Sequence, residues 1–160
     1  MRSLTLVRRI AARPSIVFEA MTSAEGVAAW FGPDDVPVVS AEMDARVGGF
    51  YRVHFRTLDG RDHVASGEFL EIVPPHRVVM SWSWASGGEL DESGRISRVE
   101  FELRPIGDGT EITFTHADLG SEASERSHAG GWSGALDKLG RHLEHTQRRA
   151  SPGSRSDERR

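Results

Sequence analysis

The 160-residue chain contains no cysteine. This excludes disulfide bonds, thiolate metal sites and a cysteine nucleophile, and it fits a reducing compartment. Long apolar runs are also absent: no stretch approaches the roughly 18 residues that span a bilayer. Arginines interrupt the N-terminal stretch MRSLTLVRRIAARPS, so no signal peptide is expected. The sequence therefore predicts a cytoplasmic protein that does not bind membranes.

Most of the chain has fewer basic than acidic residues. The net charge is −4, and residues 147–160 carry five arginines against two acidic residues. That segment contributes +3 and leaves about −7 for the rest, which argues against nucleic-acid binding. Its Ser, Gly, Pro and Arg content is typical of disorder. We expect one domain over residues 1–146, large enough to bury a core, and a disordered basic tail over residues 147–160.

The N-terminal part predicts one strand and two short helices. Apolar and polar residues alternate over residues 4–10. Pro14 stands where a first helical turn accepts proline. Thr22 precedes Glu25 by three positions, which is the pattern of a capping box at the start of a second helix. We expect this second helix to end near residues 30–31, before Gly32.

The middle of the chain predicts strands, and the end predicts a helix. Alternation recurs over residues 36–44, 50–57, 63–73, 77–84, 96–105 and 107–118, which indicates an antiparallel sheet with one covered face. Trp132, Leu136, Leu139 and Leu143 form an apolar helical stripe that supplies the cover. The expected fold is α+β: a curved antiparallel sheet of six to seven strands around a long C-terminal helix, with a cavity between them.

The start of that last helix is unusually rich in glycine, a poor helix former. Gly130 and Gly131 precede Trp132, and Gly134 and Gly140 follow. We interpret the first pair as allowing the helix backbone to approach the sheet closely, with Trp132 closing that end of the cavity.

Three polar side chains are predicted to face inward. His116 lies on the covered face of its strand, and His128 lies near the apolar stripe. Each is either a cavity acid, base or ligand donor, or a structural histidine, which is the preferred interpretation. Arg8 is expected to form a buried ion pair with Glu19, Asp44 or Glu68.

Metal and cofactor sites are not expected. His142 and His145 are three positions apart on the helix, but no acidic residue stands at a suitable position on the same face. The chain has no nucleophile motif, phosphate-binding glycine loop or cofactor fingerprint.

Five segments resemble a known family in the same order. They are RRIAARPSIVFEAMTSAEGVAAWFGP, DARVGGFYRV, GEFLEIVPPHRVVMSWSW, VEFELRPIGDGTEITFTHADL and GGWSGALDKLGRHL. The chain resembles the bacterial single-domain members of the family named for the activator of heat-shock-protein ATPase, within the START-like, Bet v 1-like (SRPBCC) superfamily. The resemblance implies the helix-grip fold. It also implies three kinds of function, because the members include ligand binders, cyclases and co-chaperone domains.

The preferred function is binding of a small apolar molecule in the cavity, without enzymatic activity. One alternative is a polyketide cyclase or aromatase with His116 or His128 as proton shuttle. The other is co-regulation of a chaperone ATPase, which is disfavoured because the eukaryotic activators carry an additional N-terminal domain that nothing here matches. A homodimer is left open. Trp82 and Trp84 either line the pocket or fill the core. The candidate ligand-binding residues are Trp30, Phe31, Tyr51, Phe55, Met80, Trp82, Trp84, Phe101, Phe114, His116, His128 and Trp132.

Overall fold

The computed structural model describes residues 2–32, 38–87, 92 and 94–159, with side chains up to Glu144. Its elements follow the predicted order of one strand, two short helices, six strands and one long helix. They are β1 (Arg2–Ile10), α1 (Pro14–Thr22), α2 (Ala24–Trp30), β2 (Val38–Met43), β3 (Phe50–Arg56), β4 (Asp62–Val73), β5 (Arg77–Ser86), β6 (Ser97–Ile106), β7 (Gly109–Leu119) and α3 (Glu122–Arg159).

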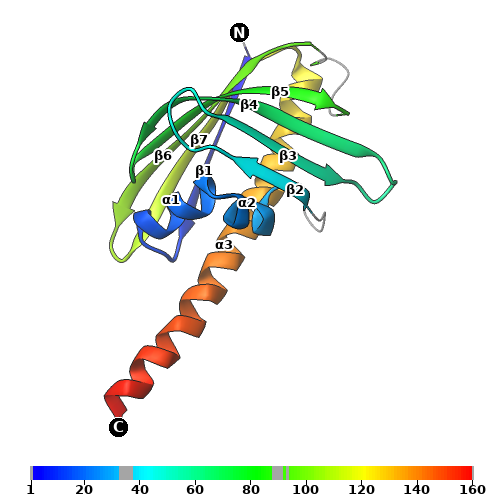
Figure 1. Ribbon diagram of the computed structural model, residues 1–160. Helices are drawn as coiled ribbons and strands as arrows, with labels where there is room; N and C mark the ends of the chain where they lie inside the picture. The colour runs from blue at the N-terminus through cyan, green and yellow to red at the C-terminus, as the bar shows by residue number, and fades with distance from the viewer. Residues whose placement is uncertain (1, 33–37, 88–91, 93, 160) are drawn as a thin grey trace.

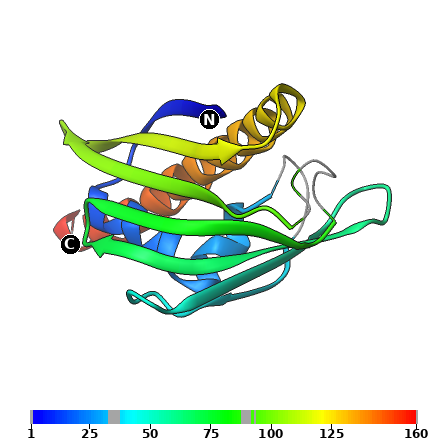
Figure 2. The same ribbon diagram turned by 90° about the horizontal axis from the view of Figure 1, so that it is seen from above.

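In the described part of the chain, the strands form one seven-stranded antiparallel sheet. Its order is β1-β7-β6-β5-β4-β3-β2, so β2 to β7 form a meander and β1 pairs with β7. The sheet curves around the N-terminal part of α3, whose C-terminal part extends beyond it, and α1 and α2 lie at the open side (Figure 1). The view in Figure 2 shows the strands wrapped over the helix. This confirms the predicted helix-grip fold.

The two short helices are joined by a cap that differs from the prediction. Thr22 still belongs to α1, and its hydroxyl donates to the Phe18 carbonyl at 2.8 Å. Ser23 is the N-cap of α2, with extended φ of −111° and a side chain that accepts from the Gly26 N–H at 3.0 Å. The predicted capping role of Thr22 is therefore wrong, because the chain leaves the helical conformation one residue later.

The core lies between the sheet and α3. Trp132, Leu136, Leu139 and Leu143 are buried, which confirms the predicted stripe. The ring of Trp132 packs against that of Phe114 at a centroid distance of 4.3 Å. The first half of α3 is thus fixed against the strands by apolar contacts.

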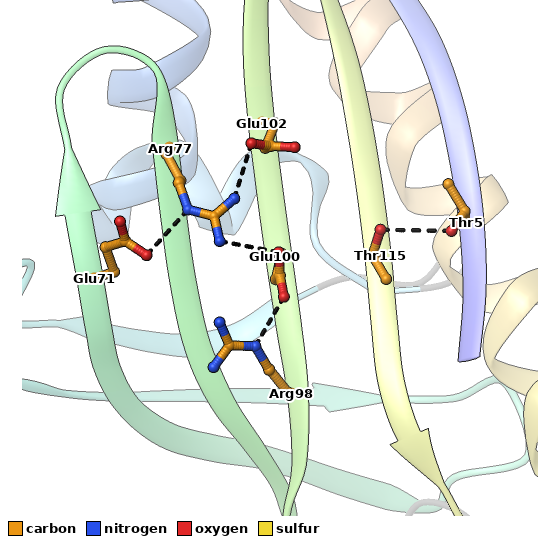
Figure 3. Close-up of polar contacts among 7 residues, drawn as sticks. All are labelled: Thr5, Glu71, Arg77, Arg98, Glu100, Glu102 and Thr115. Atoms are coloured by element: carbon orange, nitrogen blue, oxygen red, sulfur yellow. Dashed lines mark hydrogen bonds and ion pairs between the residues drawn. The ribbon is translucent and has the colours of Figure 1, made fainter. Parts of the chain in front are cut away.

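The opposite face of the sheet is polar, as the alternation predicted. Figure 3 shows Arg77 between three carboxylates. Its guanidinium donates to Glu71 at 3.0 Å, to Glu102 at 2.9 Å and to Glu100 at 3.2 Å. Arg98 donates to Glu100 at 2.8 Å. Charged side chains therefore occupy the face that α3 does not cover.

Arg8 pairs with a different residue from those predicted. Its Nε donates to Asp137 Oδ1 at 3.0 Å and its Nη2 to Ser133 Oγ at 2.6 Å. The predicted partners Glu19, Asp44 and Glu68 are wrong, and so is the predicted burial of the pair, since 51% of the Asp137 side chain is exposed. The covered side of β1 faces α3, so the helix supplies the carboxylate.

The backbone of α3 continues past the predicted boundary at residues 146–147. The side chains from residue 145 onward lie outside the described part, so the division into a domain and a disordered tail stays a prediction. None of the described helices is both long enough and apolar enough to cross a membrane.

Candidate functional site

A cavity of about 300 Å³ opens between the sheet and the first half of α3. Its buried walls are mainly aromatic, and its exposed rim is polar, the arrangement typical of small-molecule sites. The hairpin between β3 and β4, the end of α2, strand β5 and α3 all contribute. The lining residues are Phe31, Gly32, Phe55, Thr57, Asp59, Arg61, His63, Trp82, Trp84, Ser127, His128, Gly131, Trp132 and Ala135.

Trp82 is the centre of the aromatic wall. Its ring lies 5.1 Å from that of Trp132, 5.3 Å from that of Trp84 and 5.8 Å from that of Phe31, between centroids. Aromatic pairs at these distances stabilise one another beyond their buried area. The wall is therefore a packed, preformed surface.

Trp82 both lines the cavity and fills the core. It is only 3% exposed, and within the described residues its Nε1 has no hydrogen-bond acceptor. Neighbouring aromatic faces are weak acceptors for such a donor. Trp84 is less deeply buried, and its Nε1 has a partner on α3. Lining the pocket and filling the core were raised as alternatives for these tryptophans, and Trp82 does both.

The helical side of the cavity combines small residues with the rings of His128 and Trp132. A Cβ added to Gly130 or Gly131 meets no atom within 4 Å. The interpretation that these glycines permit close helix–sheet packing is therefore wrong. Gly130 is exposed, whereas Gly131 lines the cavity together with Ala135. The missing side chain of Gly131 leaves space in the cavity.

His128 lines the cavity, but both of its ring nitrogens are engaged. Its Nε2 accepts from Trp84 Nε1–H at 3.2 Å, so that nitrogen carries no proton. Its Nδ1 lies 2.8 Å from the Ser124 carbonyl oxygen and donates to it. These contacts define a neutral tautomer, in which His128 fixes the orientation of the Trp84 indole.

His116 is held in the same way, one layer deeper. Its Nδ1 accepts from Trp132 Nε1–H at 3.1 Å, and its Nε2 lies 2.8 Å from Ser97 Oγ and donates to it. Its ring centroid lies 4.9 Å from that of His128. Burial, with a smaller effect from His128, lowers the pKa of His116 from 6.5 to about 3. His116 is therefore neutral at physiological pH, and it does not line the cavity.

The hairpin between β3 and β4 forms the polar rim. Thr57 Oγ1 donates to Asp59 Oδ1 at 2.5 Å, and the Arg61 backbone N–H donates to the same oxygen at 3.1 Å. These two bonds lower the pKa of Asp59. Gly60, with a φ of +86°, completes the turn of this hairpin. His63 stacks on Phe55 at 5.2 Å between centroids and joins the rim to the aromatic wall.

Half of the predicted ligand-binding residues line the cavity, and half do not. Those that line it are Phe31, Phe55, Trp82, Trp84, His128 and Trp132. Those outside the lining are buried core residues: Trp30, Tyr51, Met80, Phe101, Phe114 and His116.

Two of the core residues show why burial alone does not indicate a ligand site. Trp30 Nε1 donates to the Ala20 carbonyl at 2.8 Å, which anchors α2 on α1. The Tyr51 hydroxyl donates to the Ser81 carbonyl at 2.6 Å, and burial raises the pKa of Tyr51. Their polar atoms are used within the fold.

Sequence reasoning missed the rim and the small residues of the helix. The missed lining residues are Gly32, Thr57, Asp59, Arg61, His63, Ser127, Gly131 and Ala135. The glycine-rich start of α3 was the one available signal, and it was interpreted as close packing. As for metals, no three potential ligand side chains are grouped together within the described residues.

Comparison with known proteins gives a consistent result. The sequence profile of the family described as Activator of Hsp90 ATPase homolog 1-like protein matches residues 11–144. A solved structure of the AHSA1 protein from Silicibacter pomeroyi is similar, with a TM-score of 0.79, 25% identity, and coverage of 91% of this chain and 99% of that one. A solved structure of a protein from Chromobacterium violaceum is also similar, with a TM-score of 0.76 and 25% identity. The match covers 89% of this chain and 96% of that one. None of the curated proteins matches the chain.

Proposed function

Because the chain belongs to the family of Activator of Hsp90 ATPase homolog 1-like proteins, we propose that it binds a small apolar molecule in the cavity between the sheet and α3. The observation that carries this proposal is the cavity of about 300 Å³ with aromatic walls and a polar rim. A site of this size is at the lower end of the range for small-molecule pockets, about 300–1,000 Å³. The ligand is correspondingly small.

The hydrogen bonds of the two histidines favour binding over catalysis. A general acid or base must exchange a proton with its substrate. His128 accepts a hydrogen bond from the Trp84 indole N–H through Nε2 and donates one to the Ser124 carbonyl through Nδ1. His116 is fully buried behind the cavity and is bonded to Trp132 and Ser97. Both therefore act as supports of the aromatic wall. A chaperone partner, a homodimer and the cytoplasmic location stay predictions.

The proposal is tested by filling the cavity from the helix side. Gly131→Leu places a side chain in the cavity, whereas Gly130→Leu places the same side chain on the exposed face one residue earlier. The neutral probe methyl 2-naphthoate is titrated and followed by tryptophan fluorescence, since Trp82, Trp84 and Trp132 line the site. We expect saturable, micromolar binding to the wild type and to Gly130→Leu, and loss of binding in Gly131→Leu.

Both variants are expected to fold, because glycine is less favourable in a helix than alanine by about 0.8–1 kcal/mol and leucine ranks close to alanine. Thermal unfolding monitored by circular dichroism verifies this. Equal probe affinity in the two variants contradicts the proposal. Native mass spectrometry of the protein purified from its own host then shows whether a small molecule is retained by the wild type and lost in Gly131→Leu.

A further inference from the structure

Among the residues that the structure describes, the rim of the cavity carries an arginine, Arg61, that has no carboxylate at ion-pair distance. The side chain of Arg61 is exposed and lines the cavity, and no described carboxylate lies within 4.0 Å of its guanidinium. The arginines of the outer face differ, since Arg77 and Arg98 are both paired. The Arg61 donors are therefore available to an anion at the cavity mouth.

The acidic residue of the rim is committed to the hairpin. One carboxylate oxygen of Asp59 accepts from the Thr57 hydroxyl and from the Arg61 backbone N–H. Both bonds lie within the five-residue turn, so the carboxylate serves to order it. Asp59 thereby holds the hairpin that presents Arg61. The charge of Arg61 lowers the pKa of Asp59 less than these two hydrogen bonds do, and the guanidinium lies beyond ion-pair distance.

The aromatic walls of the cavity favour a ligand with a rigid, flat ring system over a ligand with a flexible alkyl chain. The rings of Phe31 and Trp82 lie at 30° to each other, and Trp132 stands at 82° to Phe31, so the wall offers both faces and edges. An apolar cavity of about 150 Å³ holds benzene. A cavity of about 300 Å³ therefore has room for one or two fused rings.

We propose that the ligand is a small aromatic carboxylate, with its ring against Trp82 and its carboxylate at Arg61. This inference rests on the proposed binding function and names its ligand class. A guanidinium binds a carboxylate through two parallel hydrogen bonds, which fixes orientation as well as charge. The aromatic wall selects the ring, and Arg61 selects the anion.

Three probes separate these requirements: 2-naphthoate has the ring and the anion, methyl 2-naphthoate has the ring alone, and decanoate has the anion alone. Dissociation constants are measured by tryptophan fluorescence and calorimetry at low ionic strength. We expect 2-naphthoate to bind the wild type more tightly than either of the others. Added salt weakens its binding and leaves that of the ester unchanged, because salt screens only the charged contact.

Arg61→Gln tests the cation. We expect it to raise the dissociation constant of 2-naphthoate about fivefold, as for a partly exposed ion pair, and to leave that of the ester unchanged. Arg52→Gln is the matched control: Arg52 is exposed on the same strand pair but lies outside the cavity lining. It should change neither value. Both substitutions are on the surface, so both variants are expected to fold.

The possible failures are distinguishable. If Arg61→Gln weakens both naphthalene probes equally, or if the ester binds the wild type more tightly than 2-naphthoate, the role of Arg61 is refuted. Tighter binding of decanoate refutes the aromatic class. In these three cases the proposed binding function survives. If none of the probes binds the wild type, both proposals fail.

Discussion

Acidification is expected to destabilise the fold through His116. The folded protein keeps this imidazole neutral, with a pKa of about 3, whereas an exposed histidine has a pKa of 6.5. Below pH 6.5 the unfolded chain takes up a proton that the folded chain does not bind. The contribution of His116 to the free energy of unfolding is therefore complete above pH 6.5 and decreases as the pH falls from 6.5 towards 3.

The size of the effect follows from this difference. One pKa unit corresponds to about 1.36 kcal/mol. At pH 5, which is 1.5 units below 6.5, the loss is about 2 kcal/mol relative to neutral pH. Carboxylates with lowered pKa values, such as Asp62 and Glu111, lose their contributions only below their ordinary values of 3.8 and 4.5. The window between pH 6.5 and 5 is therefore dominated by histidines.

The measurement is urea unfolding between pH 7 and 5 in the wild type and two variants. His116→Gln removes the titrating group and keeps one acceptor and one donor for Trp132 and Ser97, so we expect its pH dependence to be weaker by about 2 kcal/mol over this range. His142→Gln, in a partly exposed helical position, is the matched control for the loss of one histidine. Identical pH profiles in all three proteins would refute the reasoning. Two-dimensional ¹H–¹⁵N spectra should also show a protonated Nε2 and an unprotonated Nδ1 for His116 down to pH 5.

Two further predictions concern the helix ends. Ser23→Ala removes the cap of α2 and should cost about 1 kcal/mol in urea unfolding, while Thr22→Ala should cost less; the reverse order would restore the capping role to Thr22. Truncation after Thr146 should leave the melting temperature unchanged, because a segment of this composition buries too little to offset its ordering entropy. A drop of several degrees would show that residues 147–160 belong to the folded unit.

Periodicity was sufficient to predict the architecture. Alternating residues such as Val99, Phe101 and Leu103 are buried as predicted, and their charged neighbours lie on the opposite face. These patterns depend only on the two-residue repeat of a strand and the 3.6-residue repeat of a helix. They show which side of each element is covered, but not which element covers it.

The errors arise where the answer depends on how elements meet. Arg8 was correctly turned inward, yet its carboxylate partner Asp137 lies 129 positions away on the helix. Gly131 was recognised as unusual, but whether it marks close packing or empty space depends on the distance between α3 and the sheet. Arg61 was not among the predicted site residues, because its place at the cavity rim depends on how the β3–β4 hairpin and α3 meet. All three features depend on distances between elements that are far apart in the chain, and these distances cannot be predicted from the local sequence.

The pairing of β1 with β7 has a consequence for how the chain reaches this fold. The other neighbouring strands follow one another along the chain, whereas Thr5 and Thr115 are 110 positions apart. At about 5–20 residues per second, β1 leaves the ribosome roughly 5–20 s before its partner strand exists. Contacts between nearby residues form faster than contacts that close a long loop. Strands β2 to β7 can therefore pair in the order of their synthesis, whereas β1 stays unpaired until β7 has been synthesised.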